Sequence, residues 1–367
     1  MKIAIIGSRG IPNRYGGFEQ FAEVVSKIWV KLGHDVICYS PHYHEFQLHE
    51  LDGVIIKHIY CPEERVGASA NIIYDYLSLR DAVAEKCDIF LQLGYASSAI
   101  SYPFFREKVR SHIVTNMDGM EWQRSKWSKP VKYLTKVSEY LAVKFSGHLV
   151  SDNKGIADYV FKSYGVKSDM IQYGCDDVGP KSRDLISSWC SKDDSYDLLI
   201  ARLEPENNIE MIIEGFIHSK SNRKLIVVGN AETRYGKYVK SLFRSHSNVF
   251  FVGSIYDKEK LDSLRQNSFL YFHGHSVGGT NPSLLEAMAA GSCVIAHDNE
   301  FNRSVLGDDS LYFKDSNQVS EIIRSSQDCS KDLDEFKVAN KQKISSNYRW
   351  EDIALQYLKC FDRVLSK

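Results

Sequence analysis

Short apolar runs alternate along the first half of the chain with longer stretches whose apolar residues recur at helical spacing. The apolar runs predict strands over residues 2–7, 35–39, 54–58, 88–93, 112–116, 148–151 and 170–173. Because most of these runs are apolar at consecutive positions, they favour a parallel sheet that helices cover on both faces. The segment 18–32 predicts the first of these helices, and Gly33 supplies its stop signal.

The alternation restarts in the second half of the chain, after a polar stretch without strand signals at residues 176–194. The second half predicts a helix over 209–217 and strands over 197–201, 224–229, 249–253, 269–272 and 293–296. The predicted fold class is α/β, with two Rossmann-like domains facing across a cleft and ligands at the carboxyl ends of the strands. We place the first domain at 1–174, the second at 175–349, and an amphipathic C-terminal helix crossing back to the first domain at 350–367.

Bulk composition narrows the class of protein. The 367 residues carry a formal net charge of −1, so bulk charge gives no reason to expect nucleic acid as a partner. The eight cysteines include no CxxC pair, and we expect buried thiols in a reducing compartment, without disulfides or a zinc site. We find no secretory leader and no apolar stretch near the roughly 20 residues of a membrane span. The sequence predicts a cytoplasmic protein, soluble or peripheral on the inner face of the plasma membrane.

A glycine-rich loop at residues 7–19 follows the first predicted strand and opens the first helix. Its Gly16-Gly17 pair lets the backbone approach a phosphate, and the helix N-terminus favours an anion. A dinucleotide site is disfavoured because the GxGxxG spacing is absent and the second strand ends without an acidic residue for a ribose. A plain tight turn is the alternative to phosphate contact.

A second glycine-rich loop precedes a helix in the other half of the chain. Asn281 is a good N-cap and Pro282 a natural first helical residue. Free backbone N–H groups at 279–283 would point into the cleft beside the positive end of the helix dipole. Glu286, one turn further, is expected to accept hydrogen bonds from ribose hydroxyls, unless the helix is merely structural and Glu286 lies at its surface. The donor-binding candidates in this loop are Gly278, Gly279, Thr280 and Asn281.

Arg202 directly follows the predicted strand 197–201. At the carboxyl end of a strand, its guanidinium can pair with a diphosphate through two parallel hydrogen bonds. The alternative is an exposed surface arginine without a ligand.

These features resemble one enzyme family. Arg202 with the Glu286 helix is similar to the C-terminal half of retaining family 4 glycosyltransferases of GT-B fold, and the Gly16-Gly17 loop is similar to their N-terminal half. The segments GSRGIPNRYGGFE, DGMEWQRSKW and HSVGGTNPSLLEAMAAG resemble bacterial β-1,4-rhamnosyltransferases that extend a lipid-diphosphate-linked sugar from dTDP-L-rhamnose. The resemblance covers nearly the whole chain. It implies a retaining, metal-independent transfer of L-rhamnose, without a cofactor, onto a lipid-linked saccharide in surface-polysaccharide synthesis.

Three positions depart from the broad family pattern. The lysine that usually accompanies the arginine is here Asn207, and the glutamate eight residues before Glu286 is here Gly278. The histidine that often precedes the aspartate at Asp118 is here Met117. Asn207 stays among the donor-binding candidates because it occupies the position of the family's phosphate cation.

Neighbouring groups are expected to replace the missing ones. Lys126 is the candidate cation, Asp118 or Glu121 the candidate carboxylate, and Asp118 also the alternative base to the leaving phosphate. The catalytic candidates are thus Asp118, Lys126 and Arg202. The acceptor-side candidates are Arg9, Glu121, Asp152 and Tyr173. Asp152 and Tyr173 follow the last two strands of the first domain, and a helix N-cap and a hinge aromatic are their respective alternatives.

The segment 122–136 interleaves two tryptophans with five cations: Arg124, Lys126, Lys129, Lys132 and Lys136. Apolar residues recur at helical spacing from Val131 through Leu134 and Leu141 to Phe145, which predicts a stripe facing the core with the lysines off it. The segment either meets anionic lipid headgroups and the lipid-diphosphate acceptor or is a solvated basic face over a core helix.

We do not expect a metal ion at the cleft loops where the sugar would be transferred. Asp332-Leu333-Asp334 spells a DxD string, which is interpreted as a helix N-cap far from the cleft loops. His273 and His275 alternate at a strand end, so their side chains are predicted to point to opposite faces.

Two other classes of protein stay open. One is a sugar-nucleotide epimerase of the same architecture, which needs acid and base carboxylates around the sugar; the glycine at 278 argues against it. The other is a non-catalytic GT-B binding protein, which the three departures suggest. Acceptor dependence separates the transferase from the epimerase, and measurable donor hydrolysis or transfer excludes the binding protein.

Overall fold

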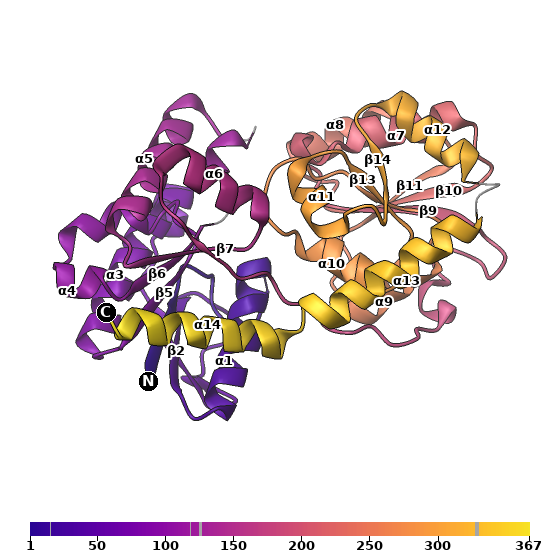
Figure 1. Ribbon diagram of the computed structural model, residues 1–367. Helices are drawn as coiled ribbons and strands as arrows, with labels where there is room; N and C mark the ends of the chain where they lie inside the picture. Colours follow the sequence, from indigo (N-terminus) through magenta and orange to yellow (C-terminus); the bar gives the residue numbers. More distant parts are fainter. Residues whose placement is uncertain (15, 118, 125–126, 327–329) are drawn as a thin grey trace. The chain divides into compact units, whose positions relative to one another are not determined.

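The computed structural model describes residues 1–14, 16–117, 119–124, 127–326 and 330–367. The chain forms two compact units, and each is described by itself (Figure 1). The first unit contains Met1–Gln123, Trp127–Gly174 and the C-terminal segment Trp350–Lys367. The second unit contains Cys175–Arg349, together with Arg124.

The first unit is built on a sheet in the order β3-β4-β2-β1-β5-β6-β7-β8. Its strands are β1 (Lys2–Ile6), β2 (Asp35–Pro41), β3 (Glu50–Leu51), β4 (Val54–Ile59), β5 (Ile89–Leu93), β6 (Ile113–Met117), β7 (His148–Ser151) and β8 (Asp169–Met170). Every pair is parallel except β3 with β4. Without the antiparallel β3, the order is that of a doubly wound Rossmann sheet, with its switch point between β1 and β5.

Helices cover this sheet on both faces. They are α1 (Gly17–Lys31), α2 (Glu63–Val66), α3 (Ala70–Ala84), α4 (Glu107–Arg110), α5 (Lys129–Phe145), α6 (Lys154–Tyr164) and α14 (Trp350–Leu365), with 3₁₀ turns at Gly67–Ser69, Ala99–Phe104 and Glu121–Gln123. Helix α1 ends where expected, because Gly33 has a φ of +87° that favours glycine. The last helix packs on α1: Trp29 Nε1 donates to Ala354 O at 3.0 Å, and Tyr357 packs edge-on against Phe21.

The second unit has an all-parallel sheet in the order β11-β10-β9-β12-β13-β14, again with a Rossmann switch point, here between β9 and β12. Its strands are β9 (Tyr196–Ile200), β10 (Lys224–Val228), β11 (Val249–Gly253), β12 (Tyr271–His273), β13 (Val294–His297) and β14 (Leu311–Phe313). Its helices are α7 (Ile209–Ser219), α8 (Arg234–Leu242), α9 (Lys258–Asn267), α10 (Pro282–Ala289), α11 (Glu300–Leu306), α12 (Ser316–Ser325) and α13 (Ser330–Asn347), with 3₁₀ turns at Arg183–Ile186 and Pro205–Asn207.

In the core of the second unit, helices α7 and α12 pack closely together. Ile209, Ile212, Ile213 and Phe216 bury one face of α7 completely. Gly215 lies on the side facing α12, where an added Cβ would approach Val319 Cβ to 2.5 Å. The glycine therefore permits the close approach of the two helices, and the apolar face drives it.

The predicted fold class is confirmed, and most predicted strands are present with ends shifted by one or two residues. The short strands β3 and β14 were not predicted, and the run 170–173 forms only the two-residue β8. The predicted stripe on α5 is wrong. Thr135, Ser138, Glu139 and Ala142 face the core, while Leu134 is 43% exposed. A hydrogen-bonded Glu139 occupies the buried face, which apolar periodicity cannot anticipate.

The seven described cysteines are buried and free: Cys38, Cys61, Cys87, Cys175, Cys190, Cys293 and Cys360. The eighth, Cys329, lies outside the described residues. Among the helices described, none is long and apolar enough to cross a membrane.

Candidate active site

The switch point of the second sheet brings two loops together. The loop after β9 carries Arg202, and the loop after β12 carries the glycines. Ser276 donates its N–H and its Oγ to Glu206 O, at 3.0 and 2.8 Å, and Asn208 Nδ2 donates to Gly274 O at 2.7 Å. An added Cβ at Gly274 would lie 2.1 Å from Asn207 O, so only glycine allows this approach. The two predicted donor segments are therefore held as one surface.

Arg202 is exposed at the end of β9, and no ion pair of its guanidinium is present among the residues that the structure describes. A hydrogen bond fixes the backbone of the loop at this residue. The side chain of Asn207, which is buried, donates from Nδ2 to Arg202 O at 2.7 Å. Asn207, which stands where the family has its phosphate-binding lysine, thus supports the arginine loop instead of facing solvent. Arg202 is therefore a cation with a fixed backbone and without an anionic partner among the described residues.

The N-terminus of α10 is capped as predicted, but fewer N–H groups are free than expected. Asn281 Oδ1 accepts from the Ser283 N–H at 3.0 Å, and Pro282 has no N–H, so the expectation of free groups as far as Ser283 is wrong. The N–H groups of Gly278 and Gly279 have no acceptor within the described part of the chain. Gly278 has a φ of +128°, and an added Cβ there would meet open space. These two N–H groups are available to an anion at the helix N-terminus.

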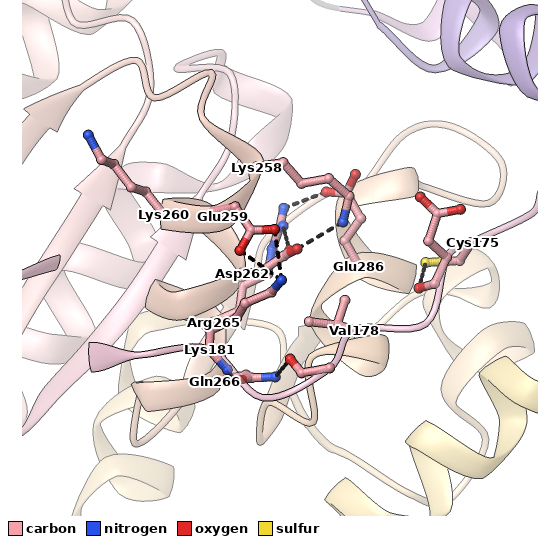
Figure 2. A network of polar contacts seen from close by, with 12 residues as sticks. Cys175, Val178, Lys181, Lys258, Glu259, Lys260, Asp262, Arg265, Gln266 and Glu286 are labelled. Atoms are coloured by element: carbon pink, nitrogen blue, oxygen red, sulfur yellow. Dashed lines mark hydrogen bonds and ion pairs between the residues drawn. The ribbon is translucent and has the colours of Figure 1, made fainter. Parts of the chain in front are cut away.

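Glu286 is held by a residue that the sequence did not reveal. Its Oε2 accepts a hydrogen bond from Nη2 of Arg265, a fully buried arginine that also donates from Nη1 to Asp262 Oδ1 at 3.1 Å (Figure 2). Lys258 Nζ lies 2.8 Å from the other oxygen of Asp262. Although burial opposes it, Glu286 is the strongest of the groups that raise the pKa of Arg265. The network fixes one oxygen of Glu286, and its Oε1 accepts no hydrogen bond from the described residues.

Only a weak sequence signal marked this network. Asp262 and Arg265 stand three residues apart in a helical segment, a spacing that predicts an ordinary surface ion pair. Their burial depends on α9 packing beside α10, which the segment itself does not encode.

His273 and His275 stack face to face, with ring centroids 4.4 Å apart and planes 13° apart. The prediction that they point to opposite faces is wrong because β12 ends at His273 and Gly274 breaks the alternation. Burial lowers the pKa of His273 to about 3. Burial, then His273 and then the charge of Arg202 lower the pKa of His275 well below its usual range. Both imidazoles are therefore neutral near pH 7, and Arg202 supplies the local positive charge.

The glycine-rich loop of the first unit is closed by its own carboxylates. Arg9 N donates to Glu19 Oε1 at 2.6 Å, and Asn13 N donates to Glu23 Oε2 at 2.7 Å. The Arg9 guanidinium pairs with Glu63 at 2.9 Å. Gly16 is the N-cap of α1 with extended backbone, and Gly17 is the first helical residue. Two carboxylates of the chain thus accept N–H groups of this loop at Arg9 and Asn13, and the phosphate contact predicted at Gly16 and Gly17 stays a prediction.

Glu19 is a residue of this loop whose role the sequence did not reveal. It is 4% exposed, and burial raises the pKa of its carboxyl group, against the backbone hydrogen bond from Arg9. Its place in the first turn of a helix is an ordinary preference of acidic residues, so the sequence gives no sign that the side chain is buried.

The acceptor-side candidates have mostly structural contacts. Tyr173 is buried, donates its hydroxyl to Gly17 O and packs on Trp350 at 5.1 Å, which agrees with the hinge-aromatic alternative. Asn153, and not Asp152, is the N-cap of α6. Glu121 lies in the 3₁₀ turn at 121–123 and accepts from Trp127 Nε1 at 3.5 Å. Asp118 and Lys126 lie outside the described residues.

Lys136 differs from the other lysines of its segment. Its Nζ contacts Glu139 Oε1 at 2.7 Å and lies over the Trp122, Tyr159 and Tyr164 rings at 4.6, 4.9 and 5.5 Å. Lys129 is exposed and Lys132 is half-buried; no ion pair of either is present among the described residues. The charge of Lys136 is therefore used within the fold, whereas Lys129 and Lys132 have no ion-pair partner among the described residues.

Within the described ranges, the His, Cys, Asp or Glu side chains that lie close enough together to hold a metal ion are those of His148, Asp169 and Cys360. These three residues belong to the first unit, and the donor loops belong to the second. The DxD string lies inside the first turns of α13, where Asp334 pairs with Lys337 at 2.9 Å, so neither of its aspartates is the N-cap.

At the switch point of this doubly wound sheet, the Arg202 guanidinium and the N–H groups of Gly278 and Gly279 have no partner among the described residues, an arrangement typical of nucleotide-binding proteins. Comparison with known proteins narrows the class. Residues 188–343 match the family described as glycosyl transferases group 1, and residues 1–176 match a domain of unknown function, DUF1972. An uncharacterized glycosyltransferase of Methanocaldococcus jannaschii is 28% identical over 179 residues, which are 46% of this chain and 45% of that protein. The alignment thus spans about half the length of the curated relative.

Solved structures share the fold along the whole chain. A sucrose-phosphate synthase of Thermosynechococcus elongatus is similar with a TM-score of 0.83 at 14% identity, covering 100% of this chain and 99% of that one. HepE of Anabaena, in complex with UDP and glucose, has a TM-score of 0.77 at 15% identity, covering 99% and 100%. A glycosyltransferase of Rickettsia africae has a TM-score of 0.74 at 13% identity, covering 99% and 98%. This chain has the GT-B fold, and its residues 188–343 are similar to glycosyl transferases group 1.

Proposed function

We propose that this chain transfers L-rhamnose from dTDP-L-rhamnose onto a lipid-diphosphate-linked saccharide, with retention of configuration and without a divalent metal, in surface-polysaccharide synthesis. The observation that carries the proposal is the donor surface of the second unit. There the guanidinium of Arg202 and the N–H groups of Gly278 and Gly279 lack partners within the described residues, while Glu286 is held with one oxygen open. A nucleoside diphosphate supplies both the anion and the ribose hydroxyls that these groups lack.

The chemistry follows from where charge develops. As the bond between the anomeric carbon and the diphosphate breaks, negative charge grows on the leaving phosphate, which Arg202 and the α10 N-terminus stabilise. The acceptor hydroxyl attacks on the departing face, and its proton passes to the leaving phosphate oxygen. Asp118 is the alternative base. Because His275 is neutral, it adds no charge to this step.

The identity of the donor nucleotide distinguishes the proposed rhamnosyl transfer from transfer of a sugar linked to UDP or GDP. The resemblance in the three quoted segments supports dTDP-L-rhamnose, whereas the structural neighbour HepE was solved with UDP and glucose. In a competition assay, dTDP is expected to displace the donor at lower concentration than UDP or GDP. Preference for UDP or GDP would remove the rhamnosyl assignment and leave the glycosyltransferase intact.

The acceptor is proposed to reach the first unit at a membrane surface. Helix α5 exposes Lys129 together with Tyr133, which is 74% exposed, and Leu134. Cations beside interfacial aromatic and aliphatic side chains support weak binding to anionic lipid. Lys136 is no longer part of the proposed contact surface, because its charge is used within the fold.

The deciding experiment is a donor screen with purified protein and a synthetic lipid-diphosphate sugar, read by mass spectrometry of the product. Transfer of rhamnose from dTDP-L-rhamnose, dependent on the acceptor and undiminished in excess EDTA, is expected. Epimerised donor without acceptor would identify an epimerase, and neither transfer nor hydrolysis with any nucleotide sugar would identify a binding protein. Loss of activity in EDTA with rescue by Mg²⁺ or Mn²⁺ would refute metal independence.

A further inference from the structure

Three side chains of metal-ligating type converge in the first unit, away from the donor loops. His148 begins β7, Asp169 begins β8 and Cys360 lies in α14. The imidazole nitrogen, a carboxylate oxygen and the thiol sulfur all lie within 4.8 Å of one another, and His148 Nε2 is 3.0 Å from Asp169 Oδ2. Their separations along the chain match no zinc-binding motif, so only the fold brings them together.

The surroundings allow an ion to enter. Cys360 is fully buried, while the side chains of His148 and Asp169 are 18% and 27% exposed. Asp169 also lines a cavity of about 600 Å³ between β8 and α14. The other residues lining the cavity are Met170, Ile171, Gln356, Lys359, Asp362 and Arg363. One side of the cluster is therefore packed, and the other opens to a space large enough for water ligands.

We propose that His148, Asp169 and Cys360 bind a borderline-soft divalent transition-metal ion, of which Zn²⁺ is the type. A thiolate and an imidazole favour such an ion over Mg²⁺ or Ca²⁺, which take oxygen ligands. With metal–ligand bonds of about 2.0–2.3 Å, tetrahedral ligand atoms lie roughly 3.3–3.8 Å apart, so side-chain adjustments of less than about 1–1.5 Å complete the site. Three protein ligands leave one coordination position facing the cavity.

In the metal-free protein, the guanidinium of Arg363 provides the positive charge beside Asp169 that the metal ion would provide when bound. Arg363 contacts Asp169 Oδ2, and its side chain is 60% exposed, so it can leave without disrupting the core. Metal binding exchanges this cation for the metal ion and releases the thiol proton of Cys360 to solvent. Arg363 thereby lowers the affinity, and its removal is expected to raise it.

The bound ion fastens the C-terminal helix to the edge of the sheet. Strand β8 has only two residues, and α14 reaches the first unit after the whole second unit has been traversed. A metal joining β7, β8 and α14 cross-links segments that are distant in sequence, which stabilises the folded state. None of the three ligands belongs to the donor surface or to the acceptor-side candidates, so the proposed role of the ion is structural.

The test uses the full chain, stripped of metal and titrated with Co²⁺ as a spectroscopic probe and with Zn²⁺ as competitor. One equivalent of Co²⁺ is expected to give a thiolate-to-cobalt absorption band in the near ultraviolet, and Zn²⁺ is expected to abolish it and raise Tm. Cys360→Ser should remove the band, and His148→Gln should weaken binding at least tenfold. Cys87→Ser, which alters another buried thiol of the same unit, should change neither readout.

Absence of the band in the wild-type protein, a Tm unaffected by Zn²⁺, or equal loss in Cys87→Ser would each overturn the proposal. If Cys360→Ser fails to fold, Arg363→Ala still decides the matter, because it removes only an exposed side chain. Its Zn²⁺ affinity is expected to rise several-fold, and an unchanged or lower affinity contradicts the site.

Discussion

The two units place a glycine-rich loop at the same point of the same kind of sheet, yet the loops differ in what they leave open. In the first unit, Glu19 and Glu23 accept the loop N–H groups, and Glu63 pairs with Arg9. In the second unit, the corresponding N–H groups and Arg202 have no such partner among the described residues. Carboxylates of the chain itself thus contact the first loop, and the second loop is the one that we propose binds the donor.

The difference teaches that a glycine-rich turn before a helix indicates an anion site without saying whose anion occupies it. Helix N-termini attract any negative charge, including a side chain one turn away. In the first loop, Glu19 is near enough to do this. In the second, the acidic residue Glu286 is held by Arg265 and stays clear of the N-terminus.

The largest effect is expected from replacing Arg265, the residue that holds Glu286 in the second unit. Arg265→Leu leaves Glu286 and Asp262 without their buried cation, and breaking a buried ion pair costs about 3–5 kcal/mol. We expect the free energy of unfolding, measured in urea, to fall by this order. Glu286→Gln is the matched control: it keeps a hydrogen-bond acceptor for Arg265, should unfold close to wild type, and should mainly raise the donor KM. Equal stability of Arg265→Leu and wild type would show that the network is not needed to hold Glu286.

Asp75, a buried carboxylate of the first unit, has no cationic partner among the described residues, and its protonation makes stability depend on pH. Burial raises the pKa of Asp75 to about 7, and its described partner is the Ser97 hydroxyl at 2.5 Å. Between about pH 4 and pH 7 the folded state holds a proton that the unfolded chain has lost, so stability falls as pH rises and is level above pH 7. Asp75→Asn should lessen this fall in urea titrations between pH 5 and 8, and part of the fall below about pH 6 should remain because burial raises the pKa of Asp197 to about 6. A fall of the same size in Asp75→Asn would assign it to another group.

Turnover should distinguish the two arginines. Arg202→Ala removes a contact that strengthens as the diphosphate leaves, so kcat is expected to drop by roughly 10²-fold or more with little change in Tm. Arg9→Ala should cost far less, because Glu63 already neutralises that guanidinium. Arg244→Ala, an exposed arginine of the second unit, controls for loss of surface charge. Similar losses in Arg202→Ala and Arg9→Ala would erase the contrast between the loops.

The glycines give a smaller and more local comparison. Gly278 has a φ of +128°, so alanine there introduces strain of about 1–3 kcal/mol, and we expect the donor KM to rise about tenfold. Gly16 has extended backbone, and an added Cβ would lie 3.5 Å from Glu19 Oε2, an ordinary contact. Gly16→Ala should therefore bind donor as wild type does. A larger effect at Gly16 than at Gly278 would place the donor phosphate in the first loop.

The smallest effect is expected at the proposed membrane surface. Lys129→Gln with Lys132→Gln should reduce sedimentation with anionic vesicles, by about 1 kcal/mol per lysine at most. Transfer to a long-chain acceptor should slow, and transfer to a short soluble analogue should not. Lys237→Gln with Lys240→Gln, two exposed lysines of α8, is the matched control. Unchanged vesicle binding would identify α5 as a solvated helix face.

The sequence predicted the sheets because each long strand is a continuous apolar run, which is a local signal. It missed β3 and β14, which are two and three residues long and too short to carry a pattern. It found Arg202, Gly278, Gly279 and Glu286 because they follow strands directly. It missed Arg265 and Glu19, whose burial depends on neighbouring elements, and it placed Asn207 with the ligand although that side chain faces the loop backbone.

The C-terminal helix has a consequence for how the protein is made. Phe21 and Trp29 on α1 are covered by Tyr357 and Ala354 of α14, residues that the ribosome adds only after the entire second unit. The first unit, although its synthesis begins first, cannot complete its core until α14 has been synthesised. During that interval its aromatic face is open to chaperones, and a nascent chain stalled at residue 349 should be held by them until it is degraded.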